Sequence, residues 1–169
     1  MPETKHGISP APYASSGDFR RIFYEENDSL HRLSFLLTAD REKAEQCFVS
    51  GLQESVSGSP VFKQWAHTWA RRTIMENAAS VINPRPLEEH APSSLDSGGT
   101  TLAMEQVETA EVLQLEPFER LVYVKAVFER CSNLDCSVLL GCARWEVIAA
   151  RIRALQQIEM QSTFTLGAG

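Results

Sequence analysis

Residues 132–155 have the sequence SNLDCSVLLGCARWEVIAARIRAL, in which a short apolar run precedes a glycine and a longer, more charged run. Ser132 is followed three positions later by Asp135, which is the spacing of a capping box at a helix N-terminus. Gly141 ends the apolar run, and glycine tolerates the left-handed conformation that often closes a helix. The pattern predicts a short helix, a tight turn and a longer helix from Arg144, which together form a helix-turn-helix.

The residues before this motif also have helical periodicity. Pro117 suits the first turn of a helix, where its missing N–H costs nothing, and apolar residues follow on one face at 118, 121, 122 and 128. A further helix, rich in glutamate, is expected over residues 102–113. The second half of the chain is therefore predicted to be helical throughout.

Three helices are predicted in the first half. The first has Asp18 as its N-cap and buries Phe19, Phe23, Leu30, Leu33 and Leu37. The second is capped by Asp40 and buries Ala44, Cys47, Phe48, Gly51 and Leu52. The third has the longest periodic stripe: Phe62, Trp65, Ala66, Trp69, Ala70, Thr73, Ile74, Asn77, Ala78 and Val81.

Charge and composition separate these two halves. Between residues 83 and 112 the sequence has one basic residue, Arg85, and six acidic residues: Glu88, Glu89, Asp96, Glu105, Glu108 and Glu111. Prolines, serines and a glycine pair fill residues 83–100, which predicts a linker. No strand signal of comparable strength occurs. We therefore expect an all-α protein with a flexible N-terminus at 1–17, a helical module at 18–82, this linker, and a helix-turn-helix module at 101–169.

The whole-chain composition limits the function classes. The 169 residues carry a net charge of −6, which argues against a surface that is basic all over. No apolar run reaches the roughly 18–20 residues that cross a bilayer, and the first residues lack the layout of a signal peptide. A cytoplasmic protein with no membrane contact is the expectation.

No motif indicates an enzyme or a cofactor site. The four cysteines, at 47, 131, 136 and 142, lack the paired spacing of a zinc site and are expected to be reduced, buried thiols. Gly-rich phosphate loops and the common hydrolase motifs are missing from the sequence. We expect no metal, no cofactor and no catalytic residues.

Five stretches, taken in order, resemble the extracytoplasmic-function sigma factors of bacterial RNA polymerase. They are LHRLSFLLTADREKAE at 30–45, FKQWA at 62–66 with the arginines at 71 and 72, LEPFER at 115–120, SNLDCSVLLG at 132–141, and Arg153-Ala154. The resemblance covers residues 18–82 and 113–157. It implies two helical modules joined by a linker, like those of the family.

The resemblance also implies partners. In the family the first module binds a coiled coil of the polymerase and melts promoter DNA, while the helix-turn-helix reads a more distal element. RNA polymerase core and promoter DNA are thus the implied partners here, and an anti-sigma factor is a further one. The implied polymerase-binding residues are Glu45, Gln46 and Val49. The candidate DNA-binding residues are Arg144, Trp145, Glu146, Arg151, Arg153, Arg71, Arg72 and Lys63.

Several residues depart from the family pattern and leave an alternative open. Lys43, Gln46 and Val49 stand where members carry acids and a glutamine, and no basic cluster follows the third helix. Ala143 stands at the cap of the recognition helix, and the positions 148–150, which are predicted to face outward, are all apolar. These departures favour a second interpretation, a sigma-like protein-interaction module or regulator that no longer reads promoters and that forms a homodimer.

Individual residues also have two interpretations. Trp65 and Trp69 either stack on unpaired bases or lie on the buried stripe, and their periodicity favours the stripe. Arg71 and Arg72 either contact DNA or form a solvated basic corner. Arg151 and Arg153 either bind phosphates or are ordinary surface charges.

Overall fold

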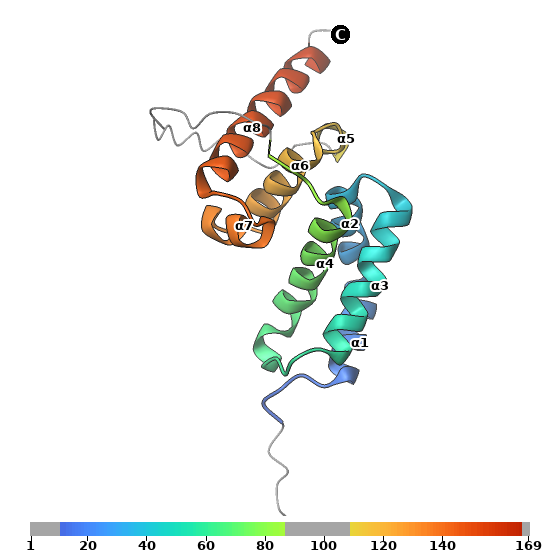
Figure 1. Ribbon diagram of the computed structural model, residues 1–169. Helices are drawn as coiled ribbons and strands as arrows, with labels where there is room; N and C mark the ends of the chain where they lie inside the picture. The colour runs from blue at the N-terminus through green and yellow to red at the C-terminus, as the bar shows by residue number, and fades with distance from the viewer. Residues whose placement is uncertain (1–10, 87–108, 167–169) are drawn as a thin grey trace, which may run out of the picture.

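The computed structural model describes residues 11–86 and 109–166 and is all-helical over these residues, as predicted (Figure 1). Outside the helices, the described residues contain one isolated β-bridge, between Tyr13 and Phe62. Most of the predicted linker and the start of the helix expected at 102–113 lie outside the described residues. The division into two modules therefore stays a prediction. None of the described helices is both long and apolar enough to cross a bilayer.

The first predicted helix is two helices. α1 spans Ser16–Glu25 and α2 spans Asn27–Thr38, and the chain leaves helical geometry at Glu26, with φ −100° and ψ 18°. The expected N-cap was also wrong by three residues. Ser15 caps α1, and Asp18 completes a capping box by accepting the Ser15 backbone N–H at 2.8 Å.

α3 and α4 form the centre of the first half. α3 spans Arg41–Ser57, and Asp40 caps it as predicted, its Oδ1 accepting the Lys43 N–H at 3.0 Å. α4 spans Ala66–Ile82 after a single 3₁₀ turn, η1, at Lys63–Trp65. A Cβ at Gly51 would lie 2.9 Å from the Ile74 side chain, so this glycine permits the close approach of α3 to α4.

The inner stripe of α4 begins later than its periodicity indicated. Ala66, Ala70, Thr73, Ile74 and Ala78 are buried, as expected. Phe62 and Trp65 are 39% and 56% exposed instead, because the 3₁₀ turn before α4 rotates both side chains off the buried face.

Within residues 109–166, the described part of the second half, there are four helices and one π-helical turn. These are α5 (Thr109–Leu113), α6 (Pro117–Tyr123), the π turn η2 (Val124–Phe128), α7 (Asn133–Leu140) and α8 (Arg144–Leu166). Pro117 occupies the first turn of α6, as predicted.

The two halves pack against each other in the described structure. Figure 1 shows α1–α4 as one group and α6–α8 as a second, with α6 against α2 and α7 against α4. One apolar cluster includes Leu37 and Ile74 from the first group together with Leu121 and Ala154 from the second. A smaller cluster between α6, α7 and α8 includes Phe118, Cys136 and Val147. The helix-turn-helix therefore has its own core and also rests on α2 and α4.

A buried arginine connects the halves at the C-terminus of α2. Arg120 is 5% exposed, and its guanidinium donates to the carbonyls of Leu37 at 3.2 Å and Thr38 at 3.3 Å. It also donates to the carbonyl of Leu115 at 3.0 Å. The last carbonyls of a helix have no partner within the helix, so Arg120 satisfies acceptors that α2 itself cannot. Burial lowers the pKa of Arg120, but an arginine remains protonated.

We expect Arg120→Met to lower the free energy of unfolding by about 3 kcal/mol, because it leaves three carbonyls without this donor. Urea denaturation followed by circular dichroism measures the loss. Arg20→Met, at an exposed position of α1, is the matched control and should leave the midpoint nearly unchanged. Equal midpoints for the two variants would contradict the role assigned to Arg120.

Candidate nucleic-acid interface

The predicted helix-turn-helix is present at α7 and α8. The Ser132 hydroxyl accepts the Asp135 N–H at 3.1 Å, and Asp135 accepts the Ser132 N–H at 3.2 Å. The Ser132 hydroxyl also donates to the Asp135 carboxylate at 2.6 Å, and this hydrogen bond, together with the one from the Ser132 N–H, holds the pKa of Asp135 below its usual value. Gly141 ends α7 with φ 63° and ψ 35°, the left-handed conformation expected there. Local sequence chemistry thus fixes both ends of α7.

Glu146 fixes the start of α8. Its Oε2 accepts the backbone N–H of Ala143 at 2.6 Å. This contact is half of a capping box, supplied by the third residue of the helix, and it partly replaces the side-chain cap that Ala143 lacks. Glu146, a candidate DNA contact by sequence, therefore has a local structural partner.

α8 buries one face and leaves the other accessible. Val147, Ala150, Ala154 and Ile158 form the buried stripe. Ala150 is thus not an outward residue, contrary to the sequence-based expectation, because it lies one turn from Val147 on the same side.

The accessible face of α8 mixes charge and apolar surface. Arg144 is exposed in the first turn, and Trp145, Ile148 and Arg151 are half-buried. Ile152 is 43% exposed. Of these, Arg144 is the cation best placed to approach a duplex, because the N-terminal residues of a recognition helix contact base edges.

Arg153 has a structural partner. Its Nε and Nη2 both lie 2.9 Å from Oε1 of Glu119, whose side chain is 4% exposed. Glu119 would be a buried, uncompensated carboxylate without this arginine. The structure therefore places Arg153 in the contact between α8 and α6.

The candidate cations of the first half also have acidic partners. Arg71 binds Glu129 through two hydrogen bonds. Arg72 donates to Glu76 at 2.7 Å and lies 5.7 Å from the ring centroid of Trp69. Lys63 lies 3.9 Å from Asp18. Arg72 and Lys63 remain 57% and 46% exposed, so their pairs are weak surface pairs that a phosphate can replace.

Three exposed aromatic side chains form a patch near the start of α4. Phe62 stacks on Tyr13 with ring centroids 4.8 Å apart and meets Trp65 edge-on at 5.3 Å. Backbone hydrogen bonds join their segments, from Ala14 N to the Val61 carbonyl at 2.7 Å and from Lys63 N to the Pro12 carbonyl at 3.0 Å. We call Tyr13, Phe62 and Trp65 the aromatic patch. Sequence periodicity missed it because Tyr13 belongs to a segment outside the predicted helices.

The three residues expected to face polymerase share one side of α3. Glu45, Gln46 and Val49 are all exposed, with Val49 at 41%. Glu45 is 3.6 Å from Nδ1 of His31 on α2. This side of α3 is free for a partner in the described structure.

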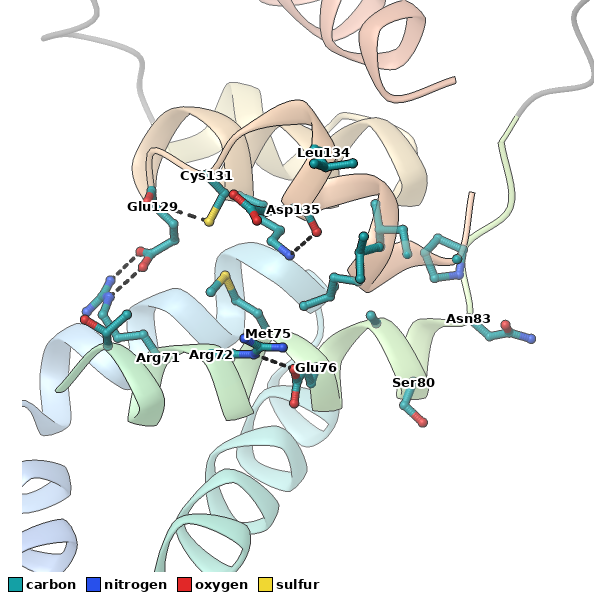
Figure 2. A pocket seen from close by; sticks show the side chains of 18 residues that line it. Arg71, Arg72, Met75, Glu76, Ser80, Asn83, Glu129, Cys131, Leu134 and Asp135 are labelled. Carbon is teal, nitrogen blue, oxygen red and sulfur yellow. Dashed lines mark hydrogen bonds and ion pairs between the residues drawn. The ribbon is translucent and has the colours of Figure 1, made fainter. Parts of the chain in front are cut away.

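A groove of about 1010 Å³ is lined by residues of α4 and α7 beside the contact between these helices (Figure 2). Arg71, Arg72 and Met75 line one wall, and Leu134 and Asp135 line the other. The groove also borders Cys131, whose thiol pKa is raised by burial. Its neighbour Cys136 is fully buried, and burial raises the pKa of that thiol to about 11.

No group of three or more histidine, cysteine or acidic residues that could hold a metal ion occurs in the part of the chain that the structure describes.

Together these features define an all-α protein with a capped helix-turn-helix packed on a four-helix group. The fold is similar to that of the sigma factor RpoE from Bartonella quintana in its complex with the anti-sigma factor NepR. The two share 18% sequence identity with a TM-score of 0.48, over 85% of this chain and 95% of that chain. No family model and no curated protein matches the chain.

We expect Gly141→Ala to destabilise the protein by about 1–2 kcal/mol, because a Cβ is unfavourable at a positive φ even where space is open. Gly17→Ala is the matched control. Gly17 lies inside α1, where a Cβ would meet nothing closer than 3.6 Å, so this change should stabilise by about 0.5–1 kcal/mol. Chemical denaturation measures both, and changes of the same sign would contradict the assigned turn geometry.

Proposed function

We propose that this chain is a sigma-factor-like transcription initiation protein that binds RNA polymerase core and promoter DNA. It acts in the cytoplasm, without a cofactor and without covalent chemistry. An anti-sigma factor is a further partner in this proposal. The ordered motifs that resemble extracytoplasmic-function sigma factors give the class, and the geometry of α7 and α8 supports it.

The accessible first turn of α8 is the observation that carries the DNA-binding part. A recognition helix must extend its N-terminal residues beyond the turn that precedes it. Arg144 meets this requirement because it is exposed directly after the turn at Gly141. An arginine there can donate to a guanine edge or to a phosphate.

The aromatic patch supports contact with unpaired bases. Aromatic faces stack on single-stranded bases, and a basic neighbour attracts the backbone. Trp65 is 56% exposed, and Lys63, two residues earlier and directly after Phe62, is also exposed. In the proposed function the patch binds the melted strand while α8 binds the duplex.

The exposed side of α3 supports the polymerase contact. It offers a carboxylate at Glu45 and an apolar contact at Val49, which suits a partner helix with basic and apolar residues.

An alternative function, a sigma-like interaction module without promoter recognition, is favoured by one observation. Ile148 and Ile152 lie on the accessible face of α8, and Arg153 is held by Glu119. This apolar face with few free cations suits a protein partner or a second copy of the chain.

DNA binding by the full chain tests the main proposal. We expect Arg144→Ala to weaken binding to a mixed-sequence duplex at low salt by about threefold to tenfold and to reduce the salt dependence by about one ion, because one cationic contact is lost. Arg20→Ala removes the same charge from α1 and should have little effect. Equal affinities for the two variants, or a wild-type protein that is dimeric and binds no duplex, would support the alternative.

Retention on immobilised bacterial core polymerase tests the second contact. We expect wild-type protein to be retained on the immobilised polymerase at low salt. The Val49→Glu variant should not be retained, because the added carboxylate replaces an apolar contact in the proposed interface. Tyr24→Glu adds the same charge at an 84% exposed position of α1, outside this side of α3, and should be retained. If wild-type protein is not retained, the initiation role is excluded.

A further inference from the structure

Arg71 is the main charged link between α4 and the helix-turn-helix. Its Nε and Nη2 donate to the two carboxylate oxygens of Glu129 at 2.7 Å and 2.5 Å (Figure 2). Its Nη1 donates to the Ser29 hydroxyl at 3.1 Å and lies 3.8 Å from Glu26. The hydrogen bonds to Glu129 raise the pKa of Arg71. The guanidinium of Arg71 thus bridges the start of α2 and Glu129.

The two partners differ in how well solvent reaches them. The Arg71 side chain is 27% exposed, whereas that of Glu129 is 9% exposed. A two-point arginine–carboxylate contact of this kind is strong and directional. If Arg71 leaves, a nearly buried carboxylate stays without a counter-charge, so Glu129 favours the state in which α7 lies on α4.

Glu129 is positioned to control the helix-turn-helix because it lies just before Ser132, the cap of α7. The preceding turn, η2, is π-helical, and such turns are rare and strained relative to an α-helix. Toward the other end of the α6–η2 segment, nine residues before Glu129, Arg120 is buried against the carbonyls of α2. One end is therefore fixed by buried hydrogen bonds, and the other by an ion pair at the edge of a groove.

We propose that the Arg71–Glu129 ion pair is an intramolecular latch, which holds α7 against α4 and which a polyanion such as DNA opens by competing for Arg71. A phosphate offers the same bidentate acceptor geometry as the Glu129 carboxylate. While the latch is closed, Arg71 is withheld from DNA, and the measured DNA affinity is lowered by the fraction of closed molecules. This inference rests on the proposed function for the identity of the polyanion.

Glu129→Gln tests the latch, because the amide keeps the shape of the side chain and removes its charge. Glu76→Gln is the matched control: it removes the same charge from the same groove but disrupts the Arg72 pair instead. Arg71→Lys is a second variant, which keeps the cation and loses the two-point contact. All are compared in the full chain, with circular dichroism to verify folding.

Hydrogen exchange without DNA measures the opening itself. We expect amides in residues 129–142 to exchange at least about tenfold faster in Glu129→Gln and Arg71→Lys than in wild-type protein, with little change in Glu76→Gln. Equal exchange in Glu129→Gln and Glu76→Gln would overturn the latch, whatever the DNA result.

Binding to a mixed-sequence duplex measures the release of Arg71. We expect Glu129→Gln to bind the duplex about threefold to tenfold more tightly than wild-type protein does, beyond any gain in Glu76→Gln. The double variant Glu129→Gln with Arg71→Gln should lose this gain in affinity, because Arg71 is then absent. Faster exchange with unchanged or weaker DNA binding would overturn the withholding of Arg71. Faster exchange with no duplex binding by any variant would support the latch as a mechanical contact and overturn the proposed function.

Discussion

The buried guanidinium of Arg120 is the contact on which the arrangement of the two halves depends. It joins α6 to the end of α2, where Leu37 and Thr38 present carbonyls that no residue of α2 can satisfy. Both sides of this contact are buried, so water cannot easily replace either partner. Because α6 also packs against α8 and shares an apolar cluster with α7, the position of the helix-turn-helix depends on an acceptor pair in the first half of the chain.

The basic side chains fall into two groups, according to whether their partners are buried or they lie at the surface. Arg120, Arg153 and Arg71 face buried or nearly buried acceptors and stabilise the packing of the helices. Arg144 and Lys63 lie at the surface, where a nucleic acid can reach them. A count of arginines in the sequence therefore overstates the positive charge available to a phosphate backbone. The net charge of −6 lowers the overall attraction to DNA further.

Features that depend on neighbouring residues could be predicted from the sequence. The cap at Asp40, the box at Ser132 and Asp135, and the left-handed Gly141 each follow from chemistry within a few residues, and the structure has all of them. The same locality explains one error. A capping box contains two candidate caps three positions apart, and the sequence favours Asp18 as the cap, whereas Ser15 holds that position.

Features that depend on distant partners could not be predicted. The exposure of Trp65 follows from a 3₁₀ turn and from Tyr13, which is separated from Phe62 by three helices. The partners of Arg71 and Arg153, Glu129 and Glu119, are likewise distant in sequence and are brought near by the packing of α6–η2. A periodic pattern reports which face of a helix is apolar, but it cannot report which charge meets that helix from another element. At Arg71 this difference decides the role, because the residue type that suits a phosphate also suits a buried carboxylate.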